Sequence, residues 1–204
     1  RQAFPTAGVS EPCALLHRAR PLKPSLRRAR SSLSVALSFC LGHVAQVSEP
    51  LAYPALHASH AGIWISTADG LVRPVGRGEA IARAAETPMI LLNAPLVAQR
   101  LGYAELSGLD LLELFAFVHP ARFVVPTAKG LSELLGLGEP TGDEAVAGLL
   151  VTAAQTLLAT LTDAAWPERE GAWDAAQALA RLHWPWARAV AAQLPRPEQK
   201  ERWL

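Results

Sequence analysis

The run Met89-Ile-Leu-Leu92, followed directly by Asn93, constrains the fold of this chain more than any other feature. Four consecutive apolar residues are expected of a strand that is buried on both faces. Asn is a preferred helix cap and Gly a frequent helix stop, so residues 94–101 are predicted to form a helix that ends at Gly102. A buried strand that leads straight into a helix indicates a layered α/β protein.

Shorter patterns extend this layer. The dipeptide Asp69-Gly70 separates two β-prone runs, residues 62–67 and 71–75, and therefore predicts a hairpin. Pro74 suits an edge strand because its nitrogen cannot donate a hydrogen bond to a neighbouring strand. Two short helices are also expected, over residues 77–86 and from a Thr127 cap to Leu135.

The pattern becomes purely helical after Asp143. Apolar residues from Val146 to Leu161 recur at the spacing of one helix face. Two more helices are expected over residues 168–182 and 186–194, separated at Pro185. Five of the six Trp residues fall in the last 39 residues. We expect them to anchor helix packing, with base stacking as the alternative.

Charge divides the chain into two parts. Residues 1–46 contain seven Arg or Lys and one acidic residue, whereas residues 47–204 contain 12 basic and 17 acidic residues. An acidic body lacks the basic surface that duplex DNA attracts. Cys13 and Cys40 both lie in the first part. Residues 47–204 therefore have neither a disulfide framework nor a cysteine zinc site.

The first 46 residues have three interpretations. We expect translated upstream DNA, with the true start near Val47; a secretory signal and a disordered basic tail are the alternatives. Arg27, Arg28 and Arg30 precede the apolar run 33–41, as in a secretory signal. The Pro- and Arg-rich stretch before them is longer than a signal's basic region, and the apolar run is shorter than the roughly 20 residues of a membrane span. We therefore expect a cytoplasmic protein without a membrane segment.

Few residues point to chemistry. The sequence has no phosphate-binding Gly-x-x-x-x-Gly-Lys-Ser/Thr loop and no Gly-x-Ser-x-Gly turn. We interpret His57-Ala-Ser-His60 as a solvated segment rather than a metal site, because no matching ligand cluster follows. Asp110 and Glu113 lie one turn apart and are candidates for a divalent cation. The favoured interpretation is a solvated first turn whose acids complement the helix dipole.

Several segments together resemble a known family. Residues 90–102 (ILLNAPLVAQRLG) are similar to the second motif of DnaQ-like 3′–5′ exonucleases, in which an apolar strand leads into Asn-Ala-x-Phe-Asp. The Asp-x-x-Glu-Leu segment of that family resembles residues 108–115, and its Leu-x-x-Leu-Leu-Gly helix resembles residues 130–137. From about Val47 to Leu137 the chain is more closely similar to the N-terminal region of alphaproteobacterial DinG-like ATP-dependent DNA helicases. The stretches that carry this similarity are LHASHAGIW, RGEAIARAAETP, LLNAPLV and GLDLLELFAFVHPARF.

The motif positions depart from an active nuclease. Active members of the exonuclease family hold two metal ions with four acidic residues. Asn93 is retained, but Val97 stands where the second-motif Asp is expected, and the third-motif His and Asp fall on Asp143 and Gly148. The first motif has no match, since Asp69 in the hairpin turn is the only acid nearby. Apolar side chains and Gly cannot bind a hard cation, so we expect no catalytic, cofactor or metal site.

The resemblance implies a degenerate ribonuclease-H-like α/β domain over residues 47–162. A Trp-rich helical connector follows over residues 163–204 and leads toward helicase motor domains of the same chain. The whole protein would couple ATP hydrolysis, with Mg²⁺, to DNA unwinding. Many members of this helicase family hold an iron–sulfur cluster in the motor, so any such cluster would be bound there. This part would dock on the motor or regulate it, through its apolar helices and Trp residues.

Two alternatives remain open. The first is a module that binds single-stranded DNA through Arg73, Arg77, Arg83, Arg100 and Trp64, which the acidic body disfavours. The second is an active 3′–5′ exonuclease that uses Asp69, Asp110 and Glu113. The apolar and Gly residues at two metal-ligand positions disfavour it.

Overall fold

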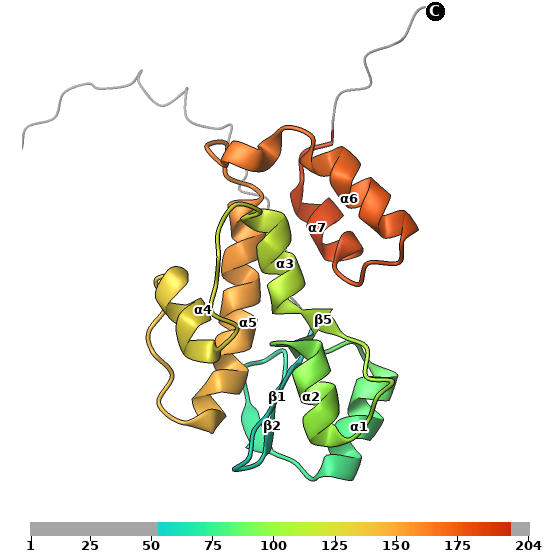
Figure 1. Cartoon of the computed structure of the whole chain (residues 1–204), viewed down its shortest axis with the longest axis vertical. Coiled ribbons are helices and arrows are strands. Elements are labelled where there is room, and N and C mark those ends of the chain that lie inside the picture. The colour runs from blue at the N-terminus through green and yellow to red at the C-terminus, as the bar shows by residue number, and fades with distance from the viewer. Residues whose placement is uncertain (1–52, 197–204) are drawn as a thin grey trace, which may run out of the picture. The chain divides into compact units, whose positions relative to one another are not determined.

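The computed structural model describes residues 53–196, which belong to one unit, Gln46–Leu204. These residues form a five-stranded mixed sheet with the order β3-β2-β1-β4-β5, together with seven α-helices and one short 3₁₀ helix (Figure 1). The predicted α/β class is confirmed. None of the helices in the described part is both long and apolar enough to cross a membrane.

The first three strands form an antiparallel meander. β1 (Ala55–Ala58) pairs with β2 (Ile63–Ser66), which pairs with the edge strand β3 (Val72–Pro74). Gly70 turns the second hairpin with φ 84°, a conformation that costs glycine little, and its N–H donates to Thr67 O at 2.9 Å. The hairpin at Asp69-Gly70 and the edge position of Pro74 are both confirmed.

Two helical crossovers add the parallel strands. α1 (Arg77–Glu86) leads to β4 (Ile90–Leu91), and α2 (Ala94–Leu101) leads to β5 (Leu109–Asp110). β4 is parallel to β1, and β5 is parallel to β4. Asn93 caps α2, since its side chain accepts a hydrogen bond from Leu96 N at 3.2 Å, and Gly102 ends the helix with φ 56°. Both predicted helices have the expected bounds.

Three helices follow the last strand. They are α3 (Leu111–Val118), α4 (Ala128–Leu134) and the long α5 (Asp143–Thr160). α5 packs against the strands of the meander and against α3 and α4. Thr127 caps α4 as predicted, since its hydroxyl accepts from Gly130 N at 3.1 Å.

The chain then enters a 3₁₀ helix, η1 (Pro167–Arg169), followed by α6 (Ala172–Arg181) and α7 (Ala187–Gln193). The expected start of a helix at residue 168 is wrong. Gly171 has a left-handed φ of 79°, so the chain leaves η1 and begins α6 four residues later. The separation of the last two helices at Pro185 is confirmed.

Buried side chains form two clusters. The smaller cluster contains Leu56 and Ile65 from the meander, Leu91 from β4, Met89 just before that strand, and residues of α1 and α2. The larger cluster contains Ala55 and Ile90 together with buried residues of α3, α5, α6 and α7. Neighbouring strand residues enter different clusters because successive side chains of a strand point to opposite faces. The last helices thus share a core with the sheet.

Candidate functional site: a histidine–aspartate pair beside the sheet

A small polar cluster lies where β1 ends and α5 begins. His57 belongs to β1, Ser59 follows the strand, and Asp143 is the first residue of α5. The Ser59 hydroxyl donates a hydrogen bond to Asp143 Oδ2, and His57 Nε2 lies 3.8 Å from Asp143 Oδ1. Strand alternation places His57 on the same face as Ala55, which is the face that packs on α5.

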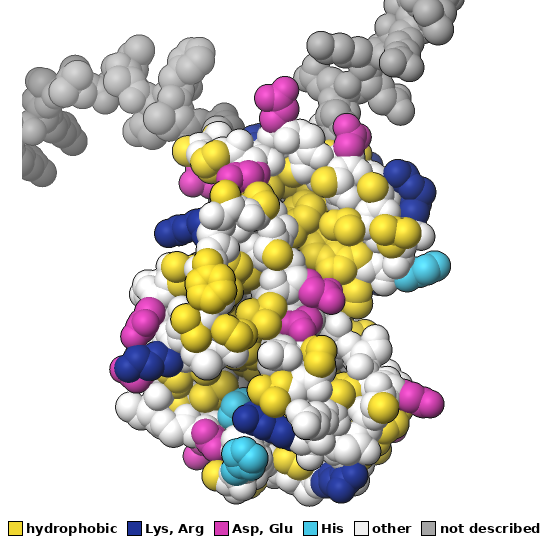
Figure 2. All heavy atoms as spheres, in the orientation of Figure 1, with side chains coloured by type: hydrophobic (Ala, Val, Ile, Leu, Met, Phe, Trp, Pro, Cys, Tyr) yellow, Lys and Arg dark blue, Asp and Glu magenta, His cyan; other side chains and the backbone are white. Residues whose placement is uncertain are grey.

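Two further side chains complete the cluster. Trp64 of β2 stacks on His57 with ring centroids 6.1 Å apart, and Arg100 of α2 donates from Nη1 to Ala58 O at 2.5 Å. The His57 side chain is 15% exposed, and its Nε2 is the buried side-chain atom without a hydrogen-bond partner among the described residues. In Figure 2, His, basic and acidic side chains gather near the lower end of the molecule.

Burial sets the protonation of this imidazole. Loss of solvent lowers the pKa of His57 below 6.5, the Asp143 carboxylate raises it, and the Arg100 guanidinium lowers it again. The net direction is downward, so His57 is neutral at neutral pH. The 3.8 Å between His57 Nε2 and Asp143 Oδ1 is too long for a hydrogen bond, so the neutral imidazole lies beside a carboxylate whose hydrogen bond in this cluster comes from Ser59.

Asp110 has a different role from the one expected. It is 6% exposed and accepts hydrogen bonds from three backbone N–H groups, those of Leu112 (2.9 Å), Asn93 (3.2 Å) and Ala94 (2.6 Å). The carboxylate therefore caps α3 and also holds the start of α2. The expectation of a solvated acidic first turn is wrong for Asp110, because its side chain is buried and its oxygens accept hydrogen bonds from backbone amides at the start of both helices.

Glu113 does not join Asp110 in a metal site. Its Oε2 accepts a hydrogen bond from Trp184 Nε1 at 3.0 Å, while Asp69 lies in the exposed hairpin turn with Thr67 as its partner. Within residues 53–196, no group of three or more His, Cys, Asp or Glu side chains is placed to hold a metal ion. The arrangement of the described acids therefore offers no support to the exonuclease alternative.

The other motif positions are structural. Val97 is 3% exposed and belongs to the smaller core cluster. Gly148 lies in α5 against β3, where an added Cβ would approach Val72 Cγ2 to 3.8 Å, an ordinary contact. Val97 therefore contributes to the core. Neither Val97 nor Gly148 has a side-chain oxygen that could bind a metal ion.

All four candidate DNA-contacting arginines are engaged within the chain. Arg73 and Arg83 both pair with Glu79. The Arg73 hydrogen bond lowers the pKa of Glu79, which stays ionised. Arg77 Nη2 donates to Gly102 O at 3.4 Å, and Arg100 is held by Ala58 O as described above. Trp64 is half-buried under His57 rather than an open stacking surface.

The interpretation of His57 as part of a solvated segment is wrong. It is a strand residue covered by Trp64 and α5, whereas His60 is exposed in the turn after the strand. The alternation of Leu56, His57 and Ala58 was the available signal, but Asp143 lies 86 positions further along the sequence. No local pattern connects two residues so far apart.

The prediction that the Trp residues anchor packing is confirmed at two positions. Trp186 is fully buried and donates from Nε1 to Asp110 O at 2.7 Å. Trp166 is 4% exposed and donates to Val118 O at 2.9 Å. Each indole therefore ties the C-terminal helices to one end of α3. Trp203 lies outside the described residues.

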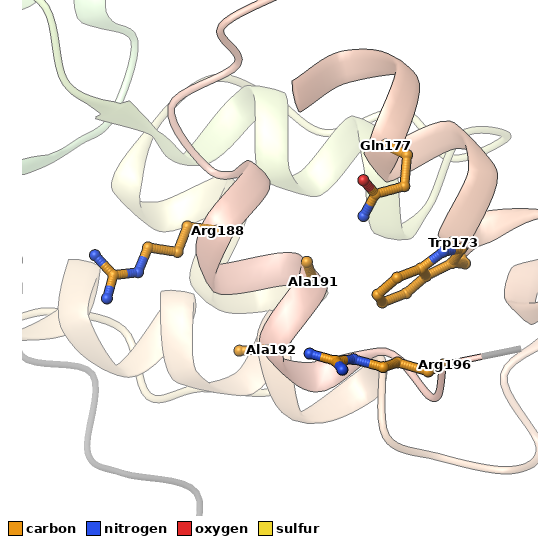
Figure 3. A pocket seen from close by; sticks show the side chains of 6 residues that line it. All are labelled: Trp173, Gln177, Arg188, Ala191, Ala192 and Arg196. Atoms are coloured by element: carbon orange, nitrogen blue, oxygen red, sulfur yellow. The ribbon is translucent and has the colours of Figure 1, made fainter. Parts of the chain in front are cut away.

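Two hollows flank α6. The first is an apolar groove of about 660 Å³ between α3 and α6, visible as a yellow hollow in Figure 2. The second is a pocket of about 500 Å³ between α6 and α7, where Trp173 and Arg196 point toward Ala191 and Ala192 (Figure 3). Glutamate residues are part of the lining of the first hollow, and arginine residues are part of the lining of the second.

No family model, curated protein or solved structure matches this chain.

Proposed function

We propose that this chain is a degenerate ribonuclease-H-like domain that docks on, and regulates, the motor of an ATP-dependent DNA helicase of the DinG-like type. It has no reaction of its own. The observation that carries the proposal is the fate of the acidic motif positions: Val97 is in the core, Asp110 is saturated by backbone amides, and Asp143 faces His57 and Ser59.

The sheet supports the ribonuclease-H-like part. That fold would place an antiparallel three-stranded meander beside two parallel strands, with the fourth strand next to the first. The order β3-β2-β1-β4-β5 and the strand directions of this chain fit such an arrangement. The long helix α5 begins at Asp143, where the resemblance puts the third motif.

The surface supports docking rather than catalysis. Phe117 and Trp184 line the groove between α3 and α6 and are partly exposed, and aromatic side chains are enriched in the cores of protein interfaces. The four arginines proposed for DNA binding are already engaged within the chain. Residues 53–196 contain no cysteine, so they supply no thiolate for an iron–sulfur cluster. ATP, Mg²⁺ and any such cluster would belong to the motor.

Sequencing the source DNA on both sides of this reading frame is the first test. We expect it to continue into a Walker-type loop and a DEAH box. The complete protein is then compared with a form that lacks residues 53–196, by DNA-stimulated ATP hydrolysis and by unwinding of a labelled duplex. Deletion is expected to change unwinding severalfold while ATP hydrolysis persists. Identical unwinding by the two forms would contradict the proposal, as would a reading frame without motor motifs.

A further inference from the structure

We propose that the groove between α3 and α6 binds an amphipathic helix with an apolar face and flanking Lys or Arg residues. This inference rests on the docking role proposed above, but it names the chemistry of the partner rather than its identity. Three properties of the groove carry it: its apolar floor and walls, the acids at its edges, and the absence of any cationic side chain from its lining.

The interior of the groove is apolar and aromatic. Its walls contain Phe117, Trp166 and Trp184, with the ring centroids of Phe117 and Trp184 5.2 Å apart. The lining also contains small residues, namely Ala116, Gly171, Ala172 and Ala175. Small residues beside large aromatic ones let a helix approach closely and insert its own side chains, which is the usual mode of helix-in-groove recognition.

Apolar side chains that line this groove are exposed to solvent. Ala116 and Ala175 are exposed on the two facing helices, and Phe117, Leu179 and Trp184 are only partly covered. A continuous apolar hollow of about 660 Å³ is a costly surface to leave in water. Its lining residues recur at helical spacing along α3 and along α6, an arrangement that fits a rod-shaped occupant better than a flat one.

Charge defines the polar side of the occupant. Glu113 lies on α3, and Glu168 and Glu170 lie in and after η1, so carboxylates border the groove from both elements. Figure 2 shows acidic side chains around the yellow hollow. Glu113 keeps one oxygen outside its bond to Trp184, and the guanidinium of Arg169, between the other two acids, donates to Asp163 O. A partner with Lys or Arg beside its apolar stripe complements this edge.

The pocket between α6 and α7 provides an internal contrast. It is lined by Arg188 and Arg196 and by no acid, and it shares only α6 with the groove. A basic helix is therefore expected to distinguish the two hollows. This contrast supplies matched control variants, because Ala175 in the groove and Ala192 in the pocket are both exposed alanines on helices.

The experiment uses fluorescence anisotropy to measure how a fluorescein-labelled, 18-residue amphipathic Leu/Lys peptide binds to the 204-residue chain. The comparison peptide has the same Leu positions with Glu in place of Lys. We expect the Leu/Lys peptide to bind at least about tenfold more tightly and to weaken with added salt. Ala175→Gln is expected to weaken the affinity for the Leu/Lys peptide about tenfold, because the larger side chain fills the groove. Ala192→Gln should change this affinity less than about twofold.

Charge variants complete the test. The double variant Glu168→Gln and Glu170→Gln neutralises the edge of the groove. It is expected to weaken the affinity for the Leu/Lys peptide roughly threefold to tenfold, the effect of losing two exposed ion pairs. The control pair Glu86→Gln and Glu105→Gln removes two exposed acids away from the groove and leaves binding unchanged. Circular dichroism confirms that each variant is folded.

Three results would overturn the inference. They are equal binding of the two peptides, equal effects of Ala175→Gln and Ala192→Gln, and a dimer of this chain that Ala175→Gln dissociates, which would assign the groove to a second copy. If the Leu/Lys peptide does not bind while deletion of residues 53–196 still alters unwinding, the docking function stands and only the partner assigned to the groove is wrong. If the peptide binds as expected while deletion has no effect, the groove is correct and the helicase role is wrong.

Discussion

Asp110 and Asp143 each lie at the start of a helix, yet the two carboxylates have opposite surroundings. Asp110 is 6% exposed and accepts three backbone hydrogen bonds from two helices. The Asp143 side chain is 35% exposed, and its partners among residues 53–196 are the Ser59 hydroxyl and the His57 imidazole. One acid is therefore a structural joint, and the other is a surface group beside a buried imidazole.

The difference shows what decides the role of an acid at a helix start. Backbone N–H groups from two helices converge on Asp110 because β4 and β5 are neighbouring parallel strands whose ends meet at one edge of the sheet. Asp143 follows Gly142, at the end of a loop, and faces the end of β1. Both acids occupy the start of a helix in the sequence. The topology of the sheet determines that Asp110 is buried and that Asp143 is partly exposed.

The largest effect is expected for Asp110→Ala. It leaves three backbone N–H groups without their charged acceptor, so the free energy of unfolding should fall by about 3 kcal/mol or more. Asp110→Asn retains an acceptor oxygen and should lose about half as much. Urea unfolding followed by circular dichroism measures both. Asp143→Ala is the matched control and should lose less than about 1 kcal/mol.

Equal losses for the two alanine variants would remove the distinction between the two acids. The same variant tests the exonuclease alternative. Mg²⁺-dependent degradation of DNA by the unaltered chain that disappears in Asp110→Ala would contradict the proposal that the chain has no reaction.

Trp186→Phe tests the same joint from the other side. The indole N–H bonds the carbonyl of Asp110, and the ring is fully buried. Phe removes the donor to this carbonyl and leaves a small cavity in place of the indole. We therefore expect the free energy of unfolding, measured with urea, to fall by about 2 kcal/mol. Trp173→Phe, at a half-buried position in the Arg-lined pocket, should lose clearly less. The opposite ranking would show that α7 is not anchored through Asp110.

Turn and helix-cap residues explain how much of the fold could be predicted from the sequence. The hairpin at Asp69-Gly70 and the helix between Asn93 and Gly102 depend on nearby residues, and their bounds are confirmed. The start of α6 was missed because Gly171 adopts a left-handed conformation that a run of helix-forming residues conceals. The cluster at His57 could not be predicted, since Asp143 reaches it only through the packing of α5 on the sheet.

A smaller effect is expected in the pH dependence of stability. Because burial lowers the pKa of His57 in the folded chain, the unfolded chain binds more protons, and stability should decrease as pH falls through the ordinary value of 6.5 toward the folded value. Asp143→Asn removes the group that raises this pKa, so the decrease should become larger. Arg100→Gln should make it smaller, because Arg100 lowers the pKa.

NMR titration of the imidazole protons checks these shifts directly, and His57→Gln assigns the resonance. His119 is the other described histidine whose pKa is lowered by burial, and it is unaffected by the Asp143 variant because Arg122 and Glu168 are its charged neighbours. A His57 midpoint above 6.5, or one that Asp143→Asn raises, would contradict the assigned surroundings.

The smallest effect is expected for the arginines proposed to contact DNA. Arg73 and Arg83 share Glu79, and their charges are already compensated on the surface. Arg73→Gln and Arg83→Gln together should therefore change the affinity for a labelled single-stranded oligonucleotide less than twofold at low salt, as measured by anisotropy. Any salt-dependent binding should instead follow the basic residues of the segment 1–46, since the remaining residues are acidic in sum. A severalfold loss in the double variant would show that these side chains leave Glu79 for phosphate, and the module that binds single-stranded DNA would then replace the docking domain as the better account of this surface.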